Sequence, residues 1–375
     1  MKISSFLIIS MIFSGGAVNA SCGKLCDWSW WIDATEVELK EEISLGSNVM
    51  GRVIYDGDTP LHEAAMYGDQ GLYPLLIQHG ADISAINDRG LTPLLAASSY
   101  GPEKNRHKRL KKLLELGANI ENETEDGKNA LNLVAGTGSF KVEPSYEAVK
   151  LLIDTGVEID KQDNQGISAL HLASKFASPK VLSLLLENGA NIQLRDAKGN
   201  SSLHYASEGK YPENLGILIQ SGLDVNTANE QADTPLHRAV WFNRIENVTK
   251  LAEQKLNLDA QNNDGDTALH KSLESAAAAH NKFLMSAGSF SQINRLQILE
   301  LLISKGANFN KPNQSGNTAL HIAAELGTVD DVEKILQGNP FLFALNNKDK
   351  TAFDLAYQNE RLKNTKMHRK MKPTQ

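Results

Sequence analysis

The chain has 375 residues, of which 41% are hydrophobic and 22% charged, and its formal net charge is −7. This is the composition of a globular protein, long enough for two average domains or one long solenoid. Residues 361–375 contain six basic side chains and no acidic one, which leaves −13 for the chain before them. Nucleic acid binding depends on clustered Lys and Arg that displace counterions, so the acidic body excludes nucleic acid as an expected partner.

Residues 1–20 have the pattern of a secretory signal peptide. Lys2 precedes an apolar run over residues 6–13, and Val18-Asn19-Ala20 resembles a small-x-small cleavage site. The segment is short for a membrane span, and no later segment is a candidate for one. We expect a secreted or periplasmic protein; the alternative is an apolar N-terminal helix that stays in the fold.

The two cysteines, Cys22 and Cys26, lie directly after the expected cleavage site. In an oxidising compartment they would form a small local disulfide, which would mainly fix the mature N-terminus. A lipid-modified Cys22 is the alternative, although Asn19-Ala20-Ser21 lacks the aliphatic residue usual in bacterial lipoprotein signals. Two thiolates alone do not complete a zinc site.

One short phrase recurs along the chain. Its first residues are separated by 33, 37, 39, 33, 33, 33, 51 and 33 residues, so longer intervals read as insertions into a fixed unit. The clear copies are Thr59-Pro60-Leu61-His62, Thr92-Pro93-Leu94-Leu95, Ser168-Ala169-Leu170-His171, Ser201-Ser202-Leu203-His204, Thr234-Pro235-Leu236-His237, Thr267-Ala268-Leu269-His270 and Thr318-Ala319-Leu320-His321. Asn129-Ala130-Leu131-Asn132 and Thr351-Ala352-Phe353-Asp354 are weaker copies.

Each unit predicts two antiparallel helices and a turn. Thr or Ser before Pro suits a helix N-cap, and the Gly that closes each Leu-rich run suits a left-handed C-cap. One such pair cannot bury its apolar faces alone, so neighbouring units must stack.

The chain resembles the ankyrin repeat family in its phrase, in its period and in the Gly-Ala-Asn that closes several units. These closing segments are Gly117-Ala118-Asn119, Gly189-Ala190-Asn191 and Gly306-Ala307-Asn308. The resemblance implies an all-α solenoid of about eight helix-turn-helix units with short β-hairpin-like turns and terminal caps. The expected domains are a signal peptide (1–20), an N-terminal cap with a Trp-rich segment and half a repeat (21–50), repeats (51–356) and a basic C-terminal tail (357–375). Insertions are expected near 102–109, 138–146 and 275–292. Of these, 102–109 reads as a solvated charged loop, and 275–292 as a helix extension.

The histidines do not indicate a metal site or a cofactor. Neighbouring helices are about 8 to 10 Å apart, too far for two such side chains to share a zinc ion. By resemblance the phrase histidines are structural: His62, His171, His204, His237, His270 and His321. No nucleophile elbow, phosphate loop or metalloprotease helix is present, so we expect neither enzyme activity nor a cofactor.

By resemblance, partners should contact the turn tips and the inner face of the first helices. Aromatic residues recur there and should line one groove, since they dominate binding energy at interfaces; the alternative is packing against the next turn. The predicted partner-binding residues are Tyr55, Met66, Tyr67, Arg89, Leu91, Tyr100, Ile167, Phe176, Trp241 and Phe242.

We therefore expect an extracytoplasmic, monomeric module that binds one or more proteins on a concave groove. The alternative function is a membrane-associated structural scaffold, held by a lipidated Cys22 or by the basic tail, without one dedicated partner.

Overall fold

The computed structural model describes residues 22–53, 55–136, 144–278, 292–363 and 365–372. The predicted signal peptide lies outside these residues, as do 138–143 and 279–291 of the predicted insertions. The chain divides into two compact units, Met1–Ala130 and Leu131–Gln375, and each is described by itself. The described residues form helices without a strand; two isolated antiparallel bridges, Gln162 with Ser168 and Arg195 with Ser201, lie in the turns.

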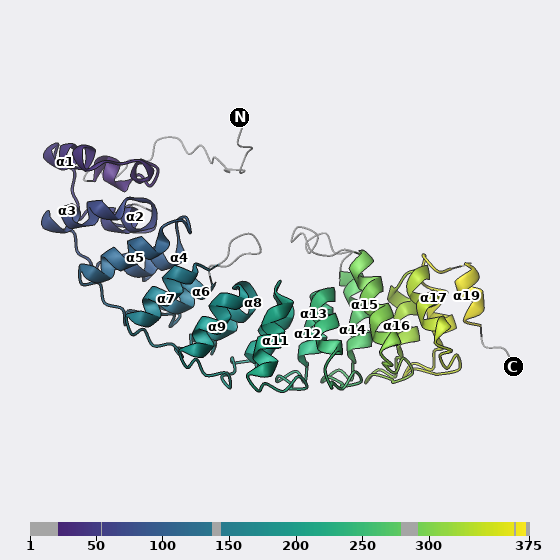
Figure 1. The fold of residues 1–375 in the computed structure, drawn as a ribbon. Helices are drawn as coiled ribbons and strands as arrows, with labels where there is room; N and C mark the ends of the chain where they lie inside the picture. The colour runs from purple at the N-terminus through teal and green to yellow at the C-terminus, as the bar shows by residue number, and fades with distance from the viewer. Residues whose placement is uncertain (1–21, 54, 137–143, 279–291, 364, 373–375) are drawn as a thin grey trace, which may run out of the picture. The chain divides into compact units, whose positions relative to one another are not determined.

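The first unit begins with a cap and continues with repeats (Figure 1). Its described helices are η1 (Gly23–Cys26), η2 (Trp30–Ile32), α1 (Glu36–Ser44), α2 (Pro60–Tyr67), η3 (Gln70–Leu72), α3 (Tyr73–Gln78), α4 (Pro93–Ser99) and α5 (Arg106–Glu115). Helix α6 (Ala130–Gly136) begins at the last residue of this unit.

The second unit repeats a pair of helices, the first short and rich in Ala and the second rich in Leu. Its further described helices are α7 (Tyr146–Asp154), α8 (Ala169–Phe176), α9 (Pro179–Glu187), α10 (Ser202–Glu208), α11 (Pro212–Gln220), α12 (Pro235–Trp241), α13 (Ile245–Ala252), α14 (Ala268–Ala278), α15 (Gln292–Ser304), α16 (Ala319–Leu326), α17 (Val329–Gln337), α18 (Ala352–Ala356) and α19 (Lys366–Lys370). First helices pack on first helices, from α8 through α10, α12, α14 and α16 to α18, and second helices pack likewise. This is the predicted solenoid of helix-turn-helix units.

The helices start where the phrase places them. Thr234 has an extended backbone and caps α12, with Pro235 in the first helical turn. At the other end of the preceding pair, Gly222 has φ +101°, a left-handed conformation that glycine adopts without strain. Local sequence therefore fixes where each helix begins and ends.

Successive turns are joined by backbone hydrogen bonds. In the second unit the amide of Ala197 donates to the carbonyl of Gln165 at 2.8 Å, and Glu230 donates to Lys198 at 3.0 Å. The turns approach so closely that a Cβ on Gly265, at φ +75°, would lie 2.5 Å from the amide nitrogen of Gln314. This ladder holds the turns in register.

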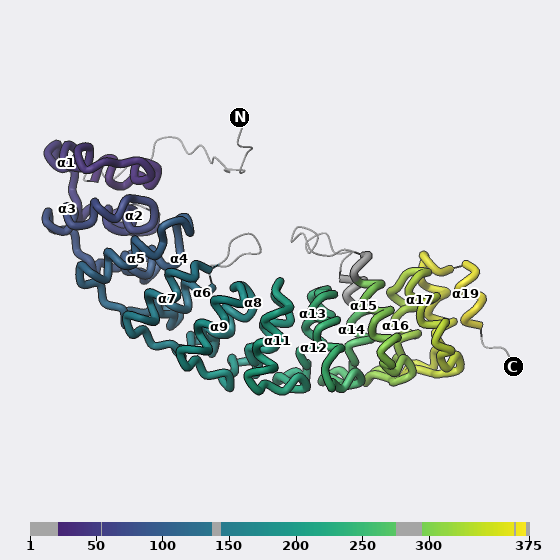
Figure 2. The backbone as a smooth tube through the Cα atoms, in the orientation of Figure 1, coloured from purple at the N-terminus to yellow at the C-terminus, as the bar shows by residue number. Residues whose placement is uncertain are grey.

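The N-terminal cap is built on Trp31. Its side chain is fully buried, and the indole Nε1–H donates to the carbonyl of Leu25 at 3.0 Å. Helices η1 and η2, at the purple end of the tube in Figure 2, both pack against α2. Trp28 is half exposed and touches Tyr67.

Two segments differ from the predictions. Residues 102–109 are only in part a solvated loop. Pro102, Lys104, Asn105 and Lys108 are exposed, but Arg106 and Arg109 are buried and donate to backbone carbonyls of residues 98–104. The C-terminal tail was predicted as a simple basic extension, but part of it folds onto the repeats. Helix α19 buries Met367 and packs on α17 and α18. Helix α14, with 11 residues, is longer than the 7 or 8 of α8, α10 and α12.

Candidate functional site

The phrase histidines hold the repeats together. In α10 the amide of Ser201 donates to Nδ1 of His204 at 3.1 Å, and Nε2 donates to the carbonyl of Asp233 in the following turn at 3.0 Å. The acceptor role of Nδ1 fixes the neutral tautomer with the proton on Nε2. Burial lowers the pKa of His204 to about 4, which keeps the ring neutral.

The other five phrase histidines make the same pair of contacts. Burial lowers the pKa of each of them below its ordinary value. Each forms hydrogen bonds with its own Thr or Ser cap and with a carbonyl of the next turn. The five residues are His62, His171, His237, His270 and His321. Within the described residues, no three His, Cys, Asp or Glu side chains converge as a metal site would require.

A row of ion pairs and aromatic rings crosses the first helices of the second unit. We call the surface formed by α8, α10, α12 and the turns before them the first-helix face. Glu208, buried at the end of α10, accepts from Lys175 of α8 at 2.6 Å and from Nε of Arg238 of α12 at 2.8 Å. One carboxylate thus links three successive repeats.

The two cations in turn contact aromatic rings. The ammonium of Lys175 lies 5.4 Å from the ring centroid of Phe176 and 5.3 Å from that of Phe242, and Arg238 lies 5.1 Å from Phe242. Cation–π contacts at these distances restrict where the rings can lie. The structure therefore brings together two of the predicted aromatic residues, Phe176 and Phe242, through Lys175.

A cleft of about 540 Å³ opens between this row and the turns. Tyr205 donates to Asp196 at its wall, at 2.9 Å. Burial would raise the pKa of Asp196, but hydrogen bonds from Asn200, Tyr205 and the backbone lower it below its ordinary value, so the carboxylate stays charged. The remaining lining residues are Gln165, Ile167, Lys175, Ala197, Lys198, Asn200, Glu208, Asn229, Gln231, Asp233, Arg238 and Phe242.

Trp241 lies one helix position before Phe242 and is 38% exposed. Its ring is 6.0 Å from the ammonium of Lys271, which pairs with Asp266 at 2.8 Å and with Glu274 at 3.0 Å. The row of aromatic rings and ion pairs therefore continues from α12 onto α14.

In the first unit the predicted residues separate into exposed and buried ones. Tyr55 is 86% exposed, and Arg89 stacks 4.6 Å from the ring of Tyr100. Met66 and Leu91, predicted to meet a partner, are 3% and 5% exposed and so are not surface residues.

Their burial has a physical reason in each case. Met66 lies on α2, which packs against α4, and its carbonyl lies 2.0 Å from the position a Cβ on Gly101 would take. The carbonyl of Leu91 itself accepts from Nε2 of His62 at 2.9 Å, which holds Leu91 against the preceding repeat. The ten predicted residues therefore belong to two separate sets, six in the first unit and four in the second.

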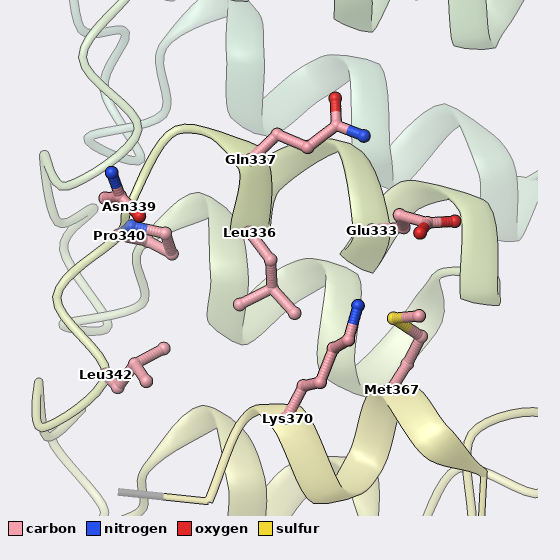
Figure 3. A pocket seen from close by; sticks show the side chains of 8 residues that line it. All are labelled: Glu333, Leu336, Gln337, Asn339, Pro340, Leu342, Met367 and Lys370. Carbon is pink, nitrogen blue, oxygen red and sulfur yellow. The ribbon is translucent and has the colours of Figure 1, made fainter. Parts of the chain in front are cut away.

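A second hollow, of about 360 Å³, lies at the C-terminal cap. Figure 3 shows Met367 and Lys370 of α19 facing Leu336 and Glu333 of α17. Its lining mixes apolar side chains with one acid and one base, and it has no row of aromatic rings. We call it the rival surface, because it is the alternative to the first-helix face as a place where a partner could bind.

Cys22 and Cys26 form a disulfide, with their Cα atoms 5.7 Å apart. Cys22 is buried against Gly51, so the bridge fixes the N-terminal segment beside α1.

The comparisons with known proteins agree with this architecture. A family model described as ankyrin repeats (3 copies) matches residues 38–122, 103–196, 141–229, 203–295 and 284–367, which together cover most of the chain. The chain belongs to the ankyrin repeat family. Repeats of this family generally mediate protein–protein interaction and are not typically catalytic.

Individual relatives match short stretches. The chain is 29% identical over 119 residues to a transient receptor potential channel, subfamily A member 1, of Drosophila melanogaster, covering 31% of this chain and 10% of that one. It is 33% identical over 118 residues to mouse Rabankyrin-5, covering 32% and 9%. The chain thus matches a tenth or less of the length of these relatives. The ankyrin repeat domain of Bcl-3 is similar at 27% identity and a TM-score of 0.49, covering 64% of this chain and 98% of that one.

Sequence reasoning missed the polar half of the first-helix face. It selected Phe176 and Phe242 but not Glu208, Arg238 or Tyr205, which hold the face together. The position directly after the phrase histidine would have shown Tyr205 and Arg238, because consecutive ankyrin repeats carry Tyr205, Arg238 and Lys271 there; Glu208, four residues after His204, has no such signal.

Proposed function

We propose that the chain is an extracytoplasmic protein–protein interaction module that binds its partner on the first-helix face of the second unit. The observation that carries the proposal is the row of Phe176, Phe242 and Trp241 beside a cleft of about 540 Å³. Aromatic side chains of this kind, next to a hollow that a partner side chain can fill, are typical of interface hot spots.

The face is also prepared for binding. Because Glu208 fixes Lys175 and Arg238, and these contact the rings, few side chains must be ordered when a partner arrives. Pre-ordered contacts reduce the entropy cost of association.

We infer a binding role and not catalysis at this cleft. Two of its carboxylates are already paired: Glu208 with two cations, and Asp196 with Tyr205 and Asn200. A catalytic acid or base would have to leave these pairings before it could reach a substrate.

The test is affinity capture from an extracytoplasmic extract, comparing the chain with the double variant Trp241→Ala, Phe242→Ala. We expect one protein to be captured by the chain and lost from the variant while the circular dichroism of both stays helical. The matched control is Phe341→Ala, Phe343→Ala, which removes two exposed rings from a turn of the same unit. Loss in the control alone, or equal capture by all three proteins, would overturn the proposal.

The alternative scaffold function needs an anchor. Lipid attachment at Cys22 needs the sulfur that the structure places in a bond to Cys26. The basic side chains of α19 remain a route to an anionic membrane surface. None of the described helices is long and apolar enough to cross a bilayer. The mass of the mature N-terminal peptide separates lipid, disulfide and an uncleaved leader.

A further inference from the structure

Acidic side chains gather on the first unit around a single cation. Asp56 and Asp58 precede α2, and Glu63 lies on its first turn. Arg89, from the next turn, reaches Asp58 at 2.9 Å and Asp56 at 3.5 Å. Three carboxyl groups thus gather around one guanidinium, whose own Nε is also buried without a hydrogen-bond partner.

Two carboxylate oxygens of this cluster have no donor. Glu63 is only 5% exposed, and its Oε2 is buried without a hydrogen-bond partner, as is Oδ1 of Asp56. Asp58 differs, because Asn87 donates to its Oδ1 at 2.6 Å. A buried carboxyl oxygen without a donor is costly, and such an atom marks a place where a ligand can supply the missing bond.

The electrostatics set the protonation state of Glu63. Burial raises its pKa to about 8, and the charges of Asp58, Asp56 and Asp27 raise it further, while Arg89 opposes them. In the free protein at neutral pH the Glu63 carboxyl is therefore protonated. A new cation beside this carboxyl would favour its anion.

Aromatic rings flank the cluster. Tyr67, one turn after Glu63 on α2, packs against Trp28 of the cap with ring centroids 5.5 Å apart, and Trp28 is half exposed. Tyr100 already stacks on Arg89. Aromatic faces beside carboxylates attract cations, and planar guanidinium groups above all.

A metal ion fits the cluster less well. Of the residues that the structure describes, no three carboxyl, imidazole or thiol groups are close enough to hold one. The two free oxygens belong to different residues, an arrangement that suits a group with several donors spread over a plane.

We propose that Asp56, Asp58 and Glu63, with Tyr67 and Trp28 beside them, form an acidic socket that receives an arginine side chain of the protein partner. The proposal deepens the proposed function and rests on it, since it gives the partner a second point of attachment and a required residue type. Arginine is preferred to lysine because its guanidinium presents several donors in one plane, and that plane can also stack on an aromatic ring.

Binding should release a proton. The arginine charge stabilises the Glu63 anion, which the charges of Asp27, Asp56 and Asp58 destabilise; Arg89 already does so in part. Tyr67 stays neutral because burial raises its pKa. Affinity should therefore rise with pH up to about 8 and then level off.

The test uses the full chain and the peptide acetyl-Gly-Ser-Arg-Ser-Gly-amide, followed by NMR at the indole signal of Trp28. The matched peptides carry citrulline, which has the same shape without the charge, or lysine. We expect the arginine peptide to bind at least about tenfold more tightly than the citrulline peptide, with lysine between them, and at least about tenfold more tightly at pH 8 than at pH 6.

The variant Glu63→Gln should abolish the pH dependence and weaken the arginine peptide at pH 8. It should still fold, since glutamine resembles the protonated carboxyl of the free protein. Glu115→Gln is the same substitution at an exposed position of α5 and should bind like the parent.

Equal binding of the arginine and citrulline peptides, an unaltered pH profile in Glu63→Gln, or displacement of the peptide by millimolar calcium would each overturn the inference. If the arginine peptide does not bind while partner capture still depends on Trp241 and Phe242, only the socket is overturned. Peptide binding without such capture overturns only the first-helix face.

Discussion

Neutralising Glu63 should stabilise the protein at alkaline pH. Its folded pKa is about 8 and its ordinary value 4.5, so between these values the folded state holds a proton that the unfolded state has lost. Stability contributed by this proton is fully present below pH 4.5 and is lost as pH rises through 8. At about 1.4 kcal/mol for each pKa unit, the whole effect is on the order of 5 kcal/mol. Glu63→Gln carries no such penalty.

The assay is urea unfolding at pH 5 and pH 9 in a Trp241→Phe background. The remaining tryptophans, Trp28, Trp30 and Trp31, all lie in the first unit, so fluorescence then reports that unit alone. We expect Glu63→Gln to gain several kcal/mol relative to the parent between pH 5 and pH 9. Parallel pH profiles for parent and variant would refute the assignment of a buried, protonated Glu63, and Glu115→Gln provides the control.

The remaining predictions concern the scaffold. Because burial lowers the pKa of His204 to about 4, the stability that its neutral ring contributes is complete above pH 6.5 and is lost as pH falls toward 4. His204→Ala should cost about 1 to 3 kcal/mol at pH 7.5, and urea titrations of this variant should show a smaller loss of stability between pH 6.5 and pH 4. Asp331→Ala removes one half of the α17 capping box and leaves Arg295 buried without its ion pair, so thermal unfolding should show a loss of about 3 to 5 kcal/mol. No loss would contradict the buried pair. Reduction of Cys22 and Cys26 should add two hydrogens in the mass spectrum and lower the stability of the first unit by about 2 kcal/mol at most; an unchanged mass would exclude the disulfide.

The helical fold could be predicted because its signals are local. A cap residue such as Thr234, the proline after it and the glycine that ends the preceding pair act within a few residues. The 33-residue period then requires stacking, because a single pair cannot bury its own apolar faces.

Side-chain burial was harder to predict because it depends on the neighbouring repeat. Met66 lies four residues after the phrase histidine, at a position predicted to be on the surface, yet it is buried on α2 where that helix packs against α4. Arg106 and Arg109 lie in a charged run that predicts solvation, yet both are buried, and four carbonyls of residues 98–104 accept hydrogen bonds from their guanidinium groups.

The candidate site was predicted only in its aromatic half. Phe176 and Phe242 stand out by residue type, but the carboxylate between Lys175 and Arg238 comes from Glu208, about one repeat away from each. Such pairing depends on how successive helices are placed in space, which periodicity alone does not give.

The most direct measurement replaces Phe242 with a photo-crosslinking phenylalanine analogue in the otherwise unaltered chain and irradiates it in an extracytoplasmic extract. The same analogue at Phe341 serves as the matched probe of the rival surface near the C-terminal cap. If the partner binds on the first-helix face, we expect one crosslinked protein from position 242 and none from position 341. Crosslinking from position 341 alone would contradict it.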